Sequence, residues 1–214
     1  MLVKDRMSHN PITVRSDTSL PDALEIMRQN KIRRLPVLDK GGKLVGIVSE
    51  KDLLYASPSP ATTLSVWEIT ALAAKVKVAE LMTKEVITVA EDCPIEEAAR
   101  IMADNKIAGL PVMRGDKLIG IITETDLFKI FVELMGAREQ GTRFALLVPE
   151  KKGILAAMAQ TVAELGGNIV ALGTFLGEDP TNRLLTIKVQ DVDKDELWAK
   201  WQELGVQLED VRET

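Results

Sequence analysis

The strongest constraint on the fold is an internal repeat, in which residues Met7–Leu53 align with residues Met82–Leu127. Short identical stretches recur in the same order in both copies. They are Ile12-Thr13-Val14 and Ile87-Thr88-Val89, Asn30-Lys31-Ile32 and Asn105-Lys106-Ile107, and Leu35-Pro36-Val37 and Leu110-Pro111-Val112. A copy of about 47 residues is marginal for a self-sufficient core. The two copies are therefore expected to pack against each other.

Within each copy, the pattern predicts the order strand, helix, strand, strand, helix. In the first copy, a short strand at Ile12 precedes a helix whose apolar residues fall at helical spacing: Leu20, Ala23, Leu24 and Met27. A strand at 35–38, a turn at Gly41-Gly42 and a strand ending at Ser49 follow. The second copy has the same order, with Pro94 at the first helical position, where proline is tolerated.

Each copy ends with a hydroxyl residue and, three positions later, an aspartate: Ser49 and Asp52, then Thr123 and Asp126. A hydroxyl at a strand-to-helix turn suits an N-cap, and the free amides of a helix N-terminus favour an anion such as phosphate. The spacing also fits a capping box, although that box prefers Glu or Gln, which reach back to the cap amide. Because the whole context is duplicated, we interpret the shorter aspartates as free carboxylates able to bind the two hydroxyls of a ribose.

Between the copies, a Pro- and Ser-rich stretch at 56–61 interrupts the pattern. The apolar residues that follow suit a connecting helix with Trp67 in the core: Leu64, Trp67, Ile69, Leu72 and Val76. The predicted boundaries are 1–60 for the first repeat, 61–78 for the connecting helix and 79–135 for the second repeat.

A polar stretch at 136–142 ends the repeat composition and is predicted to be a linker. The third unit, 143–214, reads strand, helix, strand, strand, helix, strand, which is the ferredoxin-like arrangement. Its expected strands are 144–148, 168–176, 183–189 and 206–211, and its expected helices are 154–165 and 196–204. The chain as a whole is therefore predicted to be α+β.

Composition excludes several classes of function. The net charge is −5 over 214 residues, which argues against a nucleic-acid partner. Apolar runs are too short for a membrane span and residues 1–10 lack a signal-peptide core, so we expect a cytoplasmic protein. Cys93 and His9 are the only residues of their types, and neither belongs to a metal motif or a catalytic pair. We therefore predict no catalytic site, no metal and no catalytic cofactor.

The duplicated unit, with its Leu-Pro-Val strand and its Gly-x-x-Ser/Thr-x-x-Asp-Leu ending, resembles a pair of CBS domains, also called a Bateman module. This resemblance implies a pseudo-twofold disc whose two clefts bind adenosine-containing ligands such as AMP, ADP, ATP or S-adenosylmethionine. Carried over by position, Asp52 and Asp126 would hold ribose hydroxyls. Ser49 and Thr123 would hold phosphate, and Thr13 and Thr88 with their neighbours would hold the base.

The two copies differ immediately before the Leu-Pro-Val strand, where Arg33-Arg34 stands opposite Ala108-Gly109. In the CBS family, this position often carries a cation that reaches the phosphate in the partner repeat's site. Arg33 and Arg34 would then face the ligand of Asp126, since arginine binds phosphate through bidentate hydrogen bonds. The ligand of Asp52 would face Ala108 and Gly109 and lack strong phosphate recognition. The alternative is that both arginines are solvated beside Asp39 and serve only solubility.

The third unit resembles an ACT domain, a regulatory fold that often dimerises and binds amino acids. The resemblance is carried by Pro149-Glu150-Lys151-Lys152-Gly153-Ile154-Leu155 and by Gly166-Gly167-Asn168-Ile169, with Lys152 in place of the usual proline. It implies an amino-acid site that includes Gly153 and Asn168, although Gly153 also suits a tight turn.

The order CBS, CBS, ACT is similar to the bacterial acetoin-utilisation regulatory protein family. It implies a homodimeric, ligand-sensing regulator with an unknown downstream protein partner. The alternatives are a ligand-free interaction scaffold and an enzyme acting on an adenosyl compound.

Overall fold

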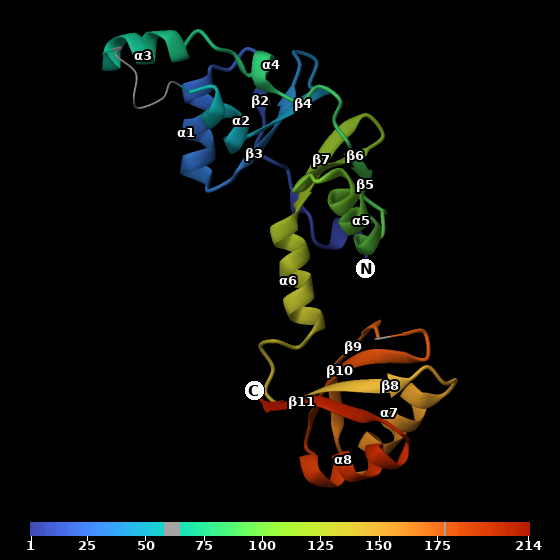
Figure 1. The fold of residues 1–214 in the computed structure, drawn as a ribbon. Helices are drawn as coiled ribbons and strands as arrows, with labels where there is room; N and C mark the ends of the chain where they lie inside the picture. Colours follow the sequence, from blue (N-terminus) through green and yellow to red (C-terminus); the bar gives the residue numbers. More distant parts are fainter. Residues whose placement is uncertain (58–64, 178) are drawn as a thin grey trace. The chain divides into compact units, whose positions relative to one another are not determined.

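The computed structural model of the chain describes residues 1–57, 65–177 and 179–214. Within these ranges the chain forms two compact units, Met1–Leu127 and Phe128–Thr214, which Figure 1 shows coloured along the sequence. Helices and strands occur in both units, so the predicted α+β class is confirmed. No helix in the described ranges has the length and apolar character needed to cross a membrane.

The first repeat contains a three-stranded sheet with two helices. Its strands are β2 (Val14–Arg15), β3 (Arg34–Leu38) and β4 (Leu44–Ser49), with β2 parallel and β4 antiparallel to the central β3. Helix α1 (Leu20–Asn30) packs its apolar side into the core of this sheet, and α2 (Glu50–Tyr55) follows β4 directly. This is the predicted order of elements.

The second repeat has the same arrangement. Its strands are β5 (Val89–Ala90), β6 (Gly109–Arg114) and β7 (Lys117–Thr123), again with a parallel first pair and an antiparallel second pair. Helix α5 (Ile95–Asn105) packs into the core and α6 (Glu124–Leu134) follows β7. The first strand of each repeat starts just after the predicted isoleucine, and Pro94 is the N-cap of α5 rather than its first residue.

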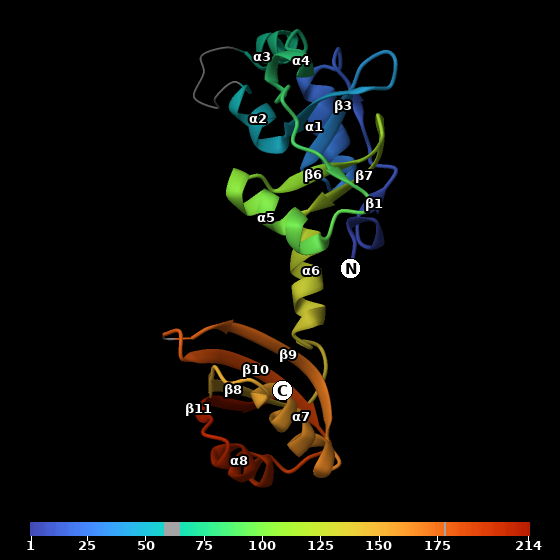
Figure 2. The same cartoon turned by 90° about the vertical axis from the view of Figure 1, so that its right-hand side faces the viewer.

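The opening residues of each repeat pack onto the other repeat, an exchange that the sequence pattern did not indicate. Strand β1 (Ser8–His9) pairs antiparallel with β7 of the second repeat (Figure 2), and the short helix η1 (Val3–Asp5) joins the same core. In return, α4 (Val78–Leu81) enters the core of the first repeat. The two cores therefore share chain segments across the boundaries expected at residues 60 and 79.

This exchange explains the glycines that open the duplicated stretches. A Cβ atom on Gly46 would overlap the sulfur of Met82, and a Cβ atom on Gly120 would overlap the sulfur of Met7. Each methionine belongs to the segment that arrives from the other repeat. A glycine within a strand marks such a close approach, so both glycines serve the packing of the two repeats against each other.

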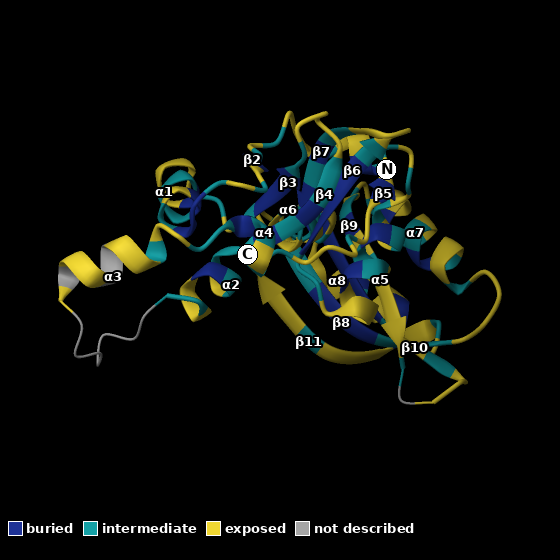
Figure 3. Cartoon of the chain, turned by 90° about the horizontal axis from the view of Figure 1, so that it is seen from above, coloured by how far each residue is buried: buried dark blue, intermediate teal, exposed yellow. Residues whose placement is uncertain are grey.

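The connecting segment differs from the prediction. Helix α3 spans Val66–Ala73 and ends before α4, whereas a single helix over 61–78 was expected; Leu64 lies outside the described residues. The prediction that Trp67 is in the core is wrong, because its side chain is 86% exposed, and Figure 3 shows α3 as largely exposed. The core of the first repeat is closed instead by Val76 and Val78, which follow α3.

The second unit is built on a four-stranded antiparallel sheet. Its strands are β8 (Thr142–Pro149), β9 (Asn168–Leu176), β10 (Asn182–Gln190) and β11 (Gln207–Glu213), in the order β11-β8-β10-β9. The first and third strands of the unit are neighbours in the centre of the sheet. This is the ferredoxin-like arrangement predicted from the sequence.

Helices α7 (Ile154–Glu164) and α8 (Lys194–Glu203) cover one face of this sheet, as both Figure 1 and Figure 2 show. Trp201 of α8 is fully buried there and meets the ring of Phe144 edge to face, with the ring centroids 5.2 Å apart. Its indole N–H donates to the backbone carbonyl of Met158 at 3.3 Å. The polar atom of the largest core side chain is thus satisfied, as burial requires.

The stretch 136–142, predicted to be a linker, is hydrogen-bonded to the sheet. Lys188 of β10 is only 4% exposed, and its ammonium donates to the carbonyl of Gly136 at 3.0 Å and to that of Glu139. Gly141 exchanges two backbone hydrogen bonds with Thr214, each of 3.0 Å. A buried ammonium needs such acceptors, so Lys188 fixes the entry of the chain into this unit.

Candidate ligand-binding clefts

The helix starts at the end of each repeat are built alike. Ser49 donates to Asp52 Oδ2 from its amide at 2.9 Å and from its hydroxyl at 2.7 Å, and the Asp52 amide donates back to Ser49 Oγ at 3.2 Å. Thr123 donates to Asp126 Oδ2 from its amide at 3.0 Å and from its hydroxyl at 2.7 Å. All four side chains are half-buried.

These bonds correct one expectation. The interpretation of Asp52 and Asp126 as free carboxylates is wrong, because each closes the capping-box contact to its cap residue with one oxygen. In both repeats the amide and the hydroxyl of the cap residue donate to the same carboxylate oxygen, Oδ2. The box orients each carboxylate at the helix start.

Thr123 and Asp126 lie in a cleft of about 600 Å³ between the repeats, which we call the Asp126 cleft. The first repeat contributes the exchanged segment 8–12, residues 31–34 at the start of β3, and Pro36. The second repeat contributes Ala108, Ile121 and residues 123–126. The predicted meeting of Arg33 and Arg34 with Thr123 and Asp126 is therefore present in the structure.

Ser49 and Asp52 lie in a second cleft of about 390 Å³, which we call the Asp52 cleft. Ala108 and Gly109 line it, as the alignment of the repeats predicted. Arg34, Lys106 and Glu85 line it as well, so the cleft contains cations that the alignment did not indicate. Weak phosphate recognition in this cleft stays a prediction. Arg34 is thus part of both clefts, whereas Arg33 lines only the Asp126 cleft.

The environments of the two arginines differ. Arg33 is exposed and Arg34 is half-buried. Burial lowers the pKa of Arg34, while the carboxylate of Glu124 raises it, Arg33 lowers it and Asp52 raises it. Neither guanidinium has an ion-pair or hydrogen-bond partner within the described residues, and Asp39 instead accepts from the amides of its own turn. The solubility role beside Asp39 therefore has no contact to support it.

The residues predicted to contact the base are Thr13 and Thr88 with their neighbours. Thr13 and Thr88 line neither cleft, whereas their neighbours Ile12 and Ile87 do, and each of these isoleucines is 39% exposed. An exposed apolar side chain in a cleft suits the face of an aromatic base. Of the residues predicted here, the isoleucines are thus the ones that line the clefts.

Two lysines in the clefts were missed. Lys31 lines the Asp126 cleft and Lys106 lines the Asp52 cleft; both have φ of 54° and follow the helix of their repeat. Their duplication in the Asn-Lys-Ile stretch was the available signal. A lysine in the left-handed region is uncommon, so both positions are conformationally restricted sites of positive charge.

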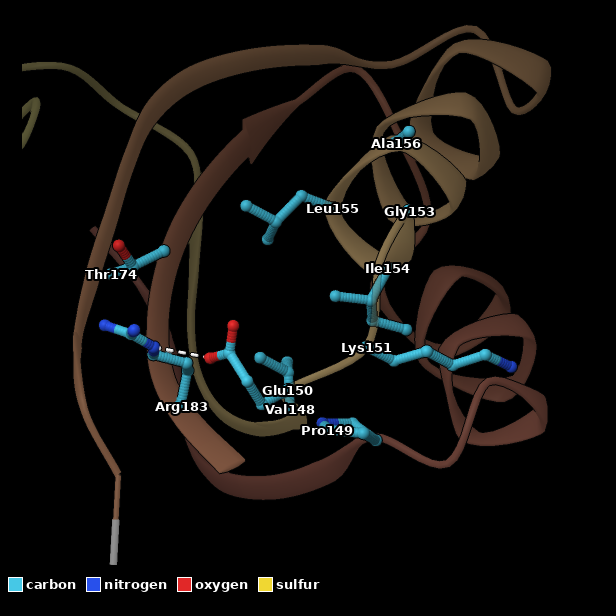
Figure 4. A pocket seen from close by; sticks show the side chains of 10 residues that line it. All are labelled: Val148, Pro149, Glu150, Lys151, Gly153, Ile154, Leu155, Ala156, Thr174 and Arg183. Carbon is cyan, nitrogen blue, oxygen red and sulfur yellow. Dashed lines mark hydrogen bonds and ion pairs between the residues drawn. The ribbon is translucent and has the colours of Figure 1, made fainter. Parts of the chain in front are cut away.

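A third cleft, of about 530 Å³, lies in the second unit at the start of α7 (Figure 4). Gly153 lines it with φ of 87°, a value that favours glycine, so its role in the turn is evident. Across the cleft, Arg183 Nε donates to Glu150 Oε2 at 2.5 Å, and the hydroxyl of Thr174 lies nearby.

The two residues predicted for an amino-acid site are not brought together within this unit. Gly153 precedes α7 and Asn168 follows it, and Asn168 does not line the cleft. A helix of this length spans roughly 16 Å, at about 1.5 Å per residue. The two positions are therefore at opposite ends of α7.

The remaining candidate groups carry no obvious chemistry. His9 is exposed and lines the Asp126 cleft. Cys93 is half-buried, and burial, followed by Glu97, Asp92 and Glu96, raises the pKa of its thiol. Within the described ranges, no group of three or more His, Cys, Asp or Glu side chains could hold a metal ion.

Comparison with known proteins shows what this architecture is similar to. The family model described as the CBS domain matches residues 3–59 and 78–133, one match for each repeat. A crystal structure of a protein assigned to acetoin utilization (AcuB) from Vibrio cholerae is 35% identical, with a TM-score of 0.53, and the match covers 65% of this chain and 96% of that one.

Two similar structures contain ligands. The CBS domain pair of protein MJ0100, in complex with 5′-methylthioadenosine and S-adenosyl-L-methionine, is 33% identical with a TM-score of 0.52, covering 65% of this chain and 98% of that one. CBSX2 in complex with AMP is 32% identical with a TM-score of 0.51, covering 61% of this chain and 96% of that one.

Proposed function

This chain belongs to the CBS-domain family, and from that premise we propose that it is a non-catalytic regulatory protein whose Asp126 cleft binds an adenine nucleotide. The observation that carries the proposal is the meeting of Arg33 and Arg34 with the start of α6 in one cleft. Phosphate oxygens suit both arginine forks and helix amides. The complexes of similar CBS pairs with AMP and with S-adenosyl-L-methionine support an adenosine-containing ligand.

Each part of the nucleotide has a place in this cleft. The Asp126 carboxylate, which its cap contacts orient at the helix start, accepts hydrogen bonds from the ribose hydroxyls, as an acidic residue does in dinucleotide folds. The base lies against Ile12 and Ile121. The phosphate lies between Thr123 at the helix start and the arginines, with Lys31 nearby. AMP, ADP and ATP fit this description, and the Asp52 cleft, without Arg33, binds phosphate more weakly.

Calorimetric titration of AMP into the full chain tests the proposal. We expect a tight step that the double variant Arg33→Ala/Arg34→Ala weakens by tenfold or more, because charge-assisted hydrogen bonds to phosphate are lost. If the double variant binds AMP as the wild type does, the proposal is wrong. If AMP, ADP, ATP and S-adenosylmethionine all fail to bind, the chain is a scaffold; if one of them is turned over, it is an enzyme.

We further propose that the second unit is an ACT-like module that dimerises the chain and responds to an amino acid. The ferredoxin-like strand order and the cleft at Gly153 support this. The similarity to the acetoin utilization protein supports a regulatory role, which we propose is exerted in the cytoplasm through a downstream protein. The net charge of −5 supports a partner other than a nucleic acid or a membrane.

Removal of residues 143–214 tests the dimer. Light scattering should then give the mass of one chain, whereas an unchanged dimer would place the contact in the CBS pair. An amino-acid screen by thermal shift tests the ligand, since a ligand at 100 times its Kd stabilises by about 2.7 kcal/mol.

A further inference from the structure

Arg34 connects the two clefts through its place in the strand ladder. It begins β3 opposite Ser49, the cap residue of α2. Its side chain runs over Gly109, where a Cβ atom would lie 3.1 Å from Arg34 Cδ and 3.5 Å from Nε. Gly109 in turn lies opposite Thr123, the residue before α6. The backbone of Arg34 therefore lies beside the start of α2, and its side chain extends toward the start of α6.

The second repeat has no equivalent arginine. Gly109 occupies the position of Arg34 in the β6–β7 ladder, and the space left by its missing side chain is where Arg34 lies. One half-buried guanidinium thus lines both clefts. A carboxylate in each cleft raises the pKa of this guanidinium: Glu124 in the Asp126 cleft and Asp52 in the Asp52 cleft.

We propose that phosphorylated ligands in the two clefts compete for Arg34, so that occupation of one cleft weakens binding in the other. This inference rests on the proposed function, because it requires ligands in both clefts. A guanidinium presents its donors in one rigid fork, and a bidentate contact orients that fork toward a single phosphate. The coupling must act equally in both directions, since binding free energies are linked.

Calorimetric titration of AMP measures this coupling. In the wild type, the weaker step reports the Asp52 cleft while the Asp126 cleft is filled. Asp126→Ala weakens the competing ligand, so at AMP concentrations that leave the Asp126 cleft empty the Asp52 cleft should bind AMP up to about tenfold more tightly than in the wild type. Thr125→Trp is the second blocking variant, because it fills the Asp126 cleft from an exposed lining position and leaves the cap contacts in place.

Three controls isolate the role of Arg34. In an Arg34→Met background, blocking the Asp126 cleft should leave the affinity of the Asp52 cleft unchanged. Arg33→Met should weaken only the tight step, because Arg33 lines only the Asp126 cleft, and this identifies which step is which. Adenosine, which has no phosphate, should bind the two clefts without coupling.

An Asp52 cleft whose affinity for AMP is the same in the wild type and in both blocked variants would overturn this inference and leave the proposed function standing. Coupling that persists in the Arg34→Met background would also overturn it. A wild type that binds no AMP would overturn both proposals.

Discussion

The matched helix starts of the two repeats allow the structural and ligand roles of the aspartates to be separated. Asp52 and Asp126 accept hydrogen bonds of nearly the same length from their cap residues, 2.9 and 2.7 Å in one and 3.0 and 2.7 Å in the other. Replacement of either by alanine removes the same two contacts from the cap residue. We therefore expect Asp52→Ala and Asp126→Ala to lower the free energy of unfolding alike, by about 1 kcal/mol each.

For a chain of 214 residues, that loss corresponds to a fall in Tm of roughly 2–4 °C. AMP affinity should respond differently. Asp126→Ala removes charge-assisted hydrogen bonds to the ribose, about 1.5–3 kcal/mol, which raises the Kd of the tight step roughly tenfold to 150-fold. Asp52→Ala should leave the tight step intact, because its carboxylate lies in the other cleft.

Thermal unfolding without ligand and calorimetry with AMP, performed on both variants, give the two quantities independently. Asp52→Ala acts as the control for the capping contribution, since its local geometry matches. A pair of variants that lose equal stability and equal AMP affinity would show that the carboxylates serve only the helix caps. Loss of the tight step in Asp52→Ala alone would show that the clefts have been assigned in the wrong order.

Three further outcomes are expected. Gly120→Ala should destabilise the chain by about 1–3 kcal/mol through overlap with the Met7 sulfur, and the double variant with Met7→Ala should recover part of the lost Tm; no recovery would contradict the packing argument. Lys188→Ala removes the ammonium that donates to the carbonyls of Gly136 and Glu139, so proteolysis within 136–142 should quicken, and an unchanged cleavage rate would show that Lys188 does not hold this stretch. Burial is the main cause of a raised pKa of the Cys93 thiol, so its thiolate forms at a higher pH than that of an ordinary cysteine. Labelling with iodoacetamide, followed by mass spectrometry, should be slow at pH 8 and accelerate toward pH 10. Fast labelling at pH 7 would contradict the shift.

The regular elements were predictable because each carries a local signal. Helix α1 has apolar residues at helical spacing, and β3 and β4 flank a glycine turn whose Gly42 has φ of 82°. Duplication doubled that signal, since each element was seen twice. The two-residue strand β1 shows the limit: it is too short for any periodicity, and its partner β7 is more than a hundred residues away in the chain, so no local pattern could reveal the exchange.

The candidate site was predictable in its residues and less so in its geometry. Ser49, Thr123 and their aspartates were found by spacing alone. Whether an aspartate reaches its cap amide depends on the backbone at the cap, where Ser49 has φ of −101° and ψ of 158°, and this is set by the preceding strand. The position of a long side chain is harder still, since Arg34 extends into both clefts only because Gly109 provides the space.

Three glycines, Gly46, Gly109 and Gly120, each leave room for a side chain from the other repeat. Gly46 and Gly120 occupy the same position in both copies, and each leaves room for the methionine that arrives from the other copy, so that contact occurs twice. Gly109 has no counterpart, because Arg34 stands at its place in the first copy. A glycine in only one copy admits the arginine of the other, and the two clefts become chemically different while the backbone remains symmetric. A duplicated unit can thus acquire two unequal clefts, without any change in fold, when one pair of equivalent positions holds different residues, here Arg34 and Gly109.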